Sequence, residues 1–193
     1  LPVLALLLFL GWPFLGVRLG SPDASILPAG LPSRQGFEVL QREFGDGELA
    51  PIMVVAQARG SVLAPANLAA LYDFTHRLAQ DPRVLRVESI VDLDPRITKE
   101  QYQLLYADPD RLTDPHARVT LGALARDDVT LIRVISKYPM IAAESQDLVR
   151  SIRRAAPATG LTLLVGGGSA TILDHVANLY ANIPRAMALV VLT

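Results

Sequence analysis

Three consecutive glycines, Gly166 to Gly168, follow an apolar stretch and precede a helical pattern, a setting in which backbone amides can cradle a phosphate group. The complete patterns are absent, because GxGxxG requires glycine where Thr171 stands and a Walker loop requires lysine followed by serine or threonine. Ser169 lies in GGSAT and therefore lacks the GxSxG pattern of a nucleophile elbow. We interpret the three glycines as a close-packed turn from a strand into a helix.

Other residues with catalytic or metal-binding potential form no recognisable set. His76, His116 and His175 are far apart in the sequence, which contains no HExxH motif, EF-hand loop or pair of carboxylates at catalytic spacing. The absence of cysteine excludes disulfides, thiolate metal sites and cysteine nucleophiles. The 18 basic and 19 acidic residues nearly cancel, and without a basic run nucleic acid is not an expected partner. We expect neither enzymatic activity nor a cofactor.

The chain begins and ends in apolar sequence. Residues 1–17 carry no charge, and a second, mainly apolar run extends from Ile183 to Thr193. As helices, the first would reach about 25 Å and the second less, against roughly 30 Å for the hydrocarbon core of a bilayer. We therefore expect two partial membrane helices, at 1–18 and within 171–193, which continue beyond this sequence and hold the intervening segment on one side of the membrane. A signal peptide or a buried core helix is an alternative for the first run.

The segment between the apolar ends has the length of one compact domain, about 165 residues. Prolines and glycines predict an extended connector that leads into a helix, together spanning 19–48. Residues 49–170 are expected to form the domain itself. Hydrophobic periodicity and the placement of proline and glycine predict the elements. They are helix 33–44, strand 52–56, helix 65–78, strand 84–91, strand 129–136, helix 141–155 and strand 161–165.

The order of these elements is β-α-β, an excursion at 92–128, and a second β-α-β. Two right-handed β-α-β units that share one antiparallel sheet form the ferredoxin-like arrangement of the α+β class. The strands at 52–56 and 129–136 are almost continuously apolar, which predicts burial on both faces and adjacent, central positions. The strand at 84–91 alternates and is expected at an edge. The strand at 161–165 belongs at the other edge, and its apolar composition predicts that something covers it.

The excursion at 92–128 contains a capping box, Thr98 with Gln101, which predicts a short helix through Tyr102 and Tyr106. The prolines in DPDRLTDPHAR predict a polar loop after that helix. The two tyrosines could line a site for an apolar compound, or they could anchor the excursion to the core.

Both ends of the chain resemble one transporter family. The segment LGSPDASILPAGLPSRQGFEVLQREFGDGELAPIMVV is similar to the one that leaves a transmembrane helix in MMPL proteins, large lipid-associated exporters of the RND superfamily. VGGGSATILDHVANLYANIPRAMALVVLT resembles the family's return to the membrane, with Pro184 at the foot of the next helix. The first segment is closer to the second repeat of such proteins, and residues 92–128 match no pattern of the family. The matching positions in the first segment include Gly20, Asp23, Leu27, Pro28, Ser33, Arg34, Phe44, Gly45 and Pro51.

This resemblance implies an extracytoplasmic porter domain of a multi-pass cell-membrane protein, in which proton flow drives export of lipids or other hydrophobic compounds. The implied partners are the lipid bilayer, a hydrophobic or lipid substrate and the other repeat of the same transporter. The proton-relay residues would lie in helices outside this chain. Candidate coupling or hinge residues are Asp23, Arg34, Gly166, Gly167, Gly168 and Asp174, and candidate substrate-facing residues are Tyr102 and Tyr106.

Two other classes of function are compatible with the sequence. A membrane-anchored sensor or adaptor domain could bind a peptide or protein at a sheet edge. A membrane-bound hydrolase could carry catalytic polar groups along the excursion.

Overall fold

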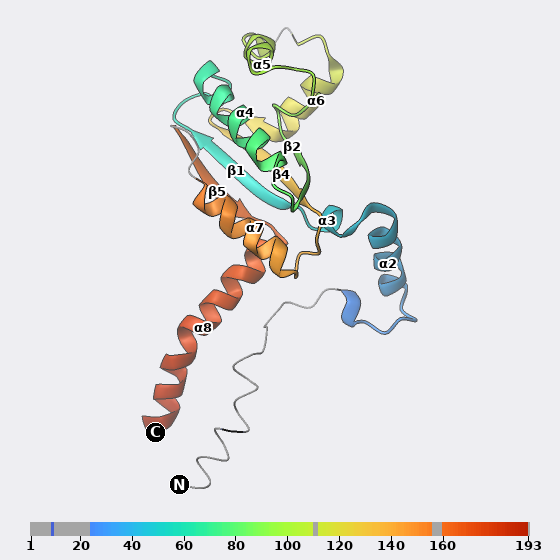
Figure 1. Ribbon diagram of the computed structural model, residues 1–193, viewed down its shortest axis with the longest axis vertical. Helices are drawn as coiled ribbons and strands as arrows, with labels where there is room; N and C mark the ends of the chain where they lie inside the picture. The colour runs from blue at the N-terminus through green and yellow to red at the C-terminus, as the bar shows by residue number, and fades with distance from the viewer. Residues whose placement is uncertain (1–8, 10–23, 110–111, 156–159, 193) are drawn as a thin grey trace.

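The computed structural model of the protein describes residue 9 and residues 24–109, 112–155 and 160–192. It combines helices with one five-stranded antiparallel sheet (Figure 1), as the α+β prediction requires. The elements in chain order are the 3-10 helix η2 (Ala24–Ile26), α2 (Pro32–Phe44), α3 (Asp46–Leu49), β1 (Ile52–Ala58), α4 (Pro65–Ala79), β2 (Val84–Glu88), α5 (Lys99–Leu105), α6 (Pro115–Leu124), β3 (Ala125–Arg126), β4 (Val129–Ser136), α7 (Ala143–Arg154), β5 (Leu161–Gly166) and α8 (Gly168–Leu192).

The strands follow the order β2-β4-β1-β5, and the short β3 pairs with β4. Every neighbouring pair is antiparallel. Val54 at the centre of β1 lies opposite Ile132 of β4 on one side and Val165 of β5 on the other. The prediction that the two most apolar strands are adjacent and central is therefore confirmed, and so is the edge position of β2.

Helices α4 and α7 lie side by side over one face of the sheet (Figure 1) and complete the core. Pro65 opens α4, whose residues Leu68, Leu71, Phe74 and Leu78 are buried. Helix α7 contributes Leu148, Val149 and Ile152, and the sheet contributes alternate residues of β1 and β4. In each helix and strand the hydrophobic residues thus recur with the period of that element, so they lie together on the face that packs into the core.

The opposite face of the sheet is less well covered. Leu131, Val55 and Leu164 lie in one row across β4, β1 and β5. Val55 and Leu131 are half-buried, while Leu164 is 58 % exposed. Burial of β1 on both faces was predicted, but the part of the chain that the structure describes provides it on one face only.

Two details differ from the sequence prediction. A register shift between Val84 and Arg86 interrupts the pairing of β2 with β4. Val84 is therefore buried and Leu85 is 53 % exposed, so strict alternation through this strand was the wrong assumption. The polar loop expected after α5 ends in a helix, α6, because Pro115 occupies a first-turn position and the Asp114 carboxylate caps the His116 amide.

Helix α8 begins at Gly168, three residues before the expected start at Thr171, and continues to Leu192. Pro184 lies within this helix instead of at the foot of a new one. Among the described residues no helix combines the length and the apolar character required to cross a bilayer. The other predicted membrane segment, 1–18, lies outside the described residues except for Phe9.

Candidate functional site

The junction between β5 and α8 contains the three glycines, and each meets a different environment. Gly167 has φ of +94°, and a Cβ atom there would lie 2.6 Å from the carbonyl oxygen of Pro51. A Cβ on Gly168 would lie 2.8 Å from the sulfur of Met140, whereas one on Gly166 would meet no atom within 4 Å. Only Gly167 therefore combines a positive φ with contact against fixed backbone. The predicted close-packed turn is centred on this residue.

An ion pair spans the same junction. Arg153 near the end of α7 makes two hydrogen bonds to the carboxylate of Asp174 in α8, at 2.5 and 2.8 Å. Its Nη2 atom also donates to the carbonyl oxygen of Val165, at the end of β5. Hydrogen bonding to Arg153 lowers the pKa of Asp174. Asp174 and the glycines, which were predicted together from the sequence as coupling or hinge candidates, thus lie at one joint, to which the structure adds Arg153.

The other two candidate coupling residues do not join this set. Arg34 lies on α2, where it donates to Glu38 at 2.6 Å and to the carbonyl oxygen of Ala24 at 3.3 Å. The first bond lies within α2 and the second joins η2 to α2, which lies at the periphery of the sheet (Figure 1). Asp23 lies outside the described residues.

Tyr102 and Tyr106 are buried, at 1 % and 2 % exposure. The Tyr102 hydroxyl accepts hydrogen bonds from the amides of Leu93 and Asp94, at 2.9 and 3.2 Å. The Tyr106 hydroxyl donates to the carbonyl oxygen of Ile90 at 2.6 Å. These contacts favour the anchoring interpretation, because both hydroxyls are engaged with the backbone that leads into the excursion. A substrate-facing role for the tyrosines stays a prediction.

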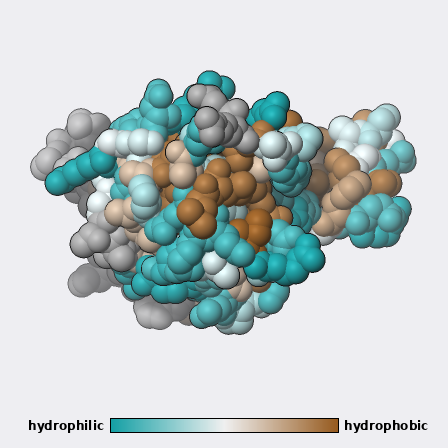
Figure 2. Space-filling view, turned by 90° about the horizontal axis from the view of Figure 1, so that it is seen from above, coloured by the Kyte–Doolittle hydropathy of each residue, from teal (hydrophilic) through white to brown (hydrophobic). Residues whose placement is uncertain are grey.

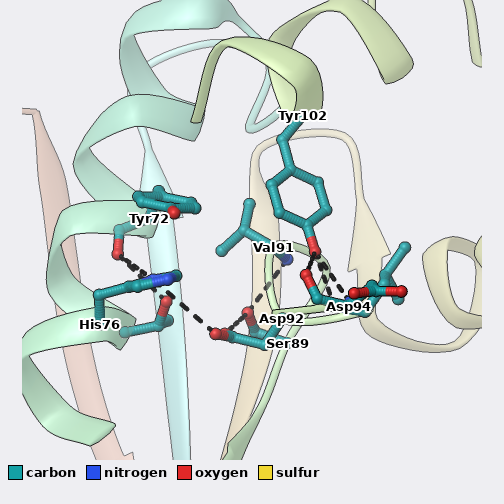
Figure 3. Close-up of polar contacts among 9 residues, drawn as sticks. Tyr72, His76, Ser89, Val91, Asp92, Asp94 and Tyr102 are labelled. Atoms are coloured by element: carbon teal, nitrogen blue, oxygen red, sulfur yellow. Dashed lines mark hydrogen bonds and ion pairs between the residues drawn. The ribbon is translucent and has the colours of Figure 1, made fainter. Parts of the chain in front are cut away.

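A cluster centred on Asp92 joins α4 to the turn after β2 (Figure 3). The Ser89 hydroxyl donates to Asp92 at 2.6 Å, and His76 approaches the other carboxylate oxygen at 3.9 Å. Burial is the largest influence on this carboxyl and raises its pKa, while hydrogen bonds from Ser89 and Thr75 and the charge of His76 act in the opposite direction. The His76 ring stacks on Tyr72 with 3.8 Å between centroids. The cluster thus holds a titratable group at low exposure.

The chemistry of this cluster is not that of a serine hydrolase. In a catalytic triad the serine hydroxyl bonds to histidine, which removes its proton. Here Ser89 donates to Asp92, and the Nδ1 atom of His76 lies 3.1 Å from the carbonyl oxygen of Tyr72. His116 lines a cavity of about 370 Å³ that reaches Ser89 and Asp92 from the side of α6. No group of three or more histidine and acidic residues suited to a metal ion is found within the described ranges.

The Asp92 cluster was not predicted from the sequence. Its members come from two segments, with Ser89 13 positions after His76 of α4, and they meet because α4 packs against β2. The spacing of Ser89 and Asp92 offers a local signal only, a polar turn at the end of a strand.

A search among known proteins connects half of the chain with one relative. Over 108 residues it is 33% identical to a Streptomyces coelicolor protein named "Putative membrane protein SCO5905". The match covers 50% of this chain and 13% of the relative, so the chain spans only a small part of that protein's length. No protein-family model matches the chain. The similarity is therefore to a protein named as a membrane protein, with no activity or substrate in that name.

Proposed function

We propose that this chain is the extracytoplasmic porter domain of a proton-driven MMPL-type exporter of the RND superfamily. In this proposal the domain shapes the path of a lipid or another hydrophobic compound and performs no chemistry. The resemblance of both chain ends to that family supports it, as does the similarity to a much longer protein named as a membrane protein.

The strand order supports the fold that this function requires. In a ferredoxin-like domain the two β-α-β units interleave, so the first and third long strands are central and both crossover helices cover one face. The order β2-β4-β1-β5, with α4 and α7 on the same face, has this form (Figure 1). This agreement supports our proposal of a ferredoxin-like domain, with α5, α6 and β3 as its insertion.

The observation that carries the proposal is the direct connection between the sheet and α8. Only Gly167 separates the end of β5 from the start of α8, a helix of 25 residues. Gly167 packs on the backbone at Pro51, and Arg153 binds both Val165 and Asp174. A displacement of α8 would consequently act on the central strands, which suits a domain that moves with a membrane helix.

The half-covered face of the sheet suits contact with another domain. Leu131, Val55 and Leu164 place an apolar row on it, and solvent-facing sheet surfaces normally carry polar side chains. In the proposed transporter this face would meet the other repeat.

Topology tests the proposal directly. The 193 residues of this chain contain no cysteine. A single cysteine introduced at Ser21 or at Asn178 of the full-length protein should react with a membrane-impermeant maleimide that is added to intact cells. Permeabilised cells provide the reference for complete labelling. Protection of one position but not the other would exclude a domain held on one membrane surface by its two ends.

One observation favours the sensor or adaptor alternative. Strand β5 is an edge strand whose Leu164 is exposed, and an extended peptide could add to such an edge. Loss of export after replacement of residues in β5, with retained labelling at both cysteines, would favour the transporter. Absence of export by the unaltered protein, together with loss of peptide binding after the same replacements, would favour the adaptor.

A further inference from the structure

Two neighbouring cavities occupy the end of the domain that lies far from the C-terminal end of α8. Both are lined by Ser61, Leu63 and Pro109, so they meet beside the loop that precedes α4. Their volumes are about 400 and 380 Å³, and each falls within the range of small-molecule sites. Figure 2 views this end from above and shows apolar side chains gathered at its centre among hydrophilic ones. We call the two cavities together the distal groove.

The two halves of the distal groove differ in chemistry. The smaller half carries no charged side chain among its described lining residues, and the Gln103 amide in it donates to the carbonyl oxygen of Pro65. The larger half contains Arg118, Arg126 and Asp127. The remaining lining residues are Ala64, Tyr106 and Ala107 in the smaller half, and Val62, Leu121, Gly122 and Ala125 in the larger. One end is therefore apolar and the other charged.

Among the residues that the structure describes, the arginines of the larger half have no carboxylate partner. Arg118 donates from Nη2 to the carbonyl oxygen of Leu112 at 2.6 Å, and neither Arg118 nor Arg126 forms an ion pair within the described ranges. Several arginines elsewhere in the domain, such as Arg83 and Arg133, are paired with acidic side chains. With two arginines and one acidic residue, Asp127, the described lining of the larger half carries a net positive charge.

We propose that the distal groove binds a single-chain amphiphile with an anionic head, of the class of long-chain carboxylates. The chain would lie in the smaller half, where burial of its methylene groups is favourable. The head would lie in the larger half, because a planar guanidinium binds a carboxylate through two parallel hydrogen bonds. This inference deepens the proposed function, on which it rests for its biological role, since it names the compound class and the part of the domain that holds it. Binding itself is measurable without transport.

The test uses hexadecanoate with a photoreactive diazirine near the end of its chain. The whole 193-residue chain, in phosphatidylcholine nanodiscs, is irradiated with increasing probe, and labelled peptides are mapped by mass spectrometry. We expect saturable labelling at residues 61–65 and 103–109. Unlabelled hexadecanoate should compete at least about tenfold better than hexadecanol, because the neutral head loses a charge-assisted hydrogen bond. Competition by hexadecyl phosphate at the level of hexadecanoate would assign the site to anionic heads in general.

Matched variants separate the groove from the bilayer. Ala107→Phe, which fills the smaller half, should abolish saturable labelling, while Ala79→Phe at the exposed end of α4 should not. Arg126→Gln should weaken competition about tenfold, and Arg77→Gln, which removes an arginine outside the groove, should not change it. Labelling that is unsaturable, or unchanged in Ala107→Phe, would overturn the inference. Export and topology would be unaffected by that result, so failure of this inference is distinct from failure of the proposed function.

Discussion

Arg153 of α7 and Asp174 of α8 form a two-point ion pair, with Nη1 2.5 Å from Oδ1 and Nη2 2.8 Å from Oδ2. Because Arg153 also binds the carbonyl oxygen of Val165, one guanidinium connects α7, the end of β5 and α8. The two side chains are 35% and 60% exposed, and exposed pairs contribute about 0–1 kcal/mol to stability. The pair is therefore better suited to fixing the direction of α8 than to holding the domain together.

Breaking this pair should affect α8 more than global stability. Asp174→Asn should change the free energy of unfolding by less than about 1 kcal/mol. It should also speed amide hydrogen exchange in the first turns of α8 and reduce export by the full-length protein. The exchanged pair, Arg153→Asp with Asp174→Arg, restores the charges but not the bond to Val165, so partial recovery is expected. Unchanged exchange in Asp174→Asn would show that the pair does not orient α8.

The glycines of the junction should respond unequally to substitution. Gly167→Ala should destabilise the domain by roughly 1–3 kcal/mol from backbone strain alone, with the contact against Pro51 adding to this. Gly166→Ala should be nearly neutral, because the added Cβ meets open space. Thermal unfolding of both variants measures the difference. Equal melting temperatures would contradict the fixed turn at Gly167.

The hydroxyls of the two buried tyrosines should contribute to stability. Tyr102→Phe leaves the amides of Leu93 and Asp94 without their acceptor and should cost about 1–3 kcal/mol. Tyr106→Phe removes one bond, to the carbonyl oxygen of Ile90, and should cost less. Tyr138→Phe is the matched control, since that side chain is 37% exposed. A loss of export without loss of stability in Tyr106→Phe would instead support a substrate-facing role.

The sequence predicted the centre of the fold well, because local and tertiary preferences agree there. Pro65 opens α4, Leu68, Leu71 and Leu78 lie on one helical face, and the structure buries that face against the central strands. The capping box of Thr98 with Gln101 is also present, with both reciprocal hydrogen bonds.

The wrong predictions arise where a local sequence pattern is compatible with two different structures. Pro115 suits a loop as well as the first turn of a helix, and the capping bond from Asp114 decides for the helix. Strict alternation in β2 could not reveal the register shift beside Val84, which depends on pairing with β4. The cluster of Asp92 with His76 depends on packing between segments that are distant in the sequence. Hydrophobic periodicity does not predict which distant segments come into contact.

The half-buried carboxyl of Asp92 should make stability depend on pH in an unusual direction. Burial raises its pKa above 3.8, so the folded state binds the proton more tightly than the unfolded chain does. As pH rises through the raised value, ionisation of Asp92 costs stability. Asp92→Asn keeps an acceptor for Ser89 without the charge and should therefore be more stable than the natural protein near neutral pH. This advantage should shrink as pH falls toward about 4.

The variant Asp81→Asn should show the opposite dependence of stability on pH. Hydrogen bonding to Arg83 lowers the pKa of Asp81, so its ionised form stabilises the folded state above pH 3.8 and the contribution is lost at lower pH. This variant should be less stable than the natural protein near neutral pH and should approach it in acid. Melting temperatures from about pH 4 to 8 distinguish the two cases. A constant difference across that range in Asp92→Asn would mean that Asp92 is ionised throughout and that its cluster does not respond to pH.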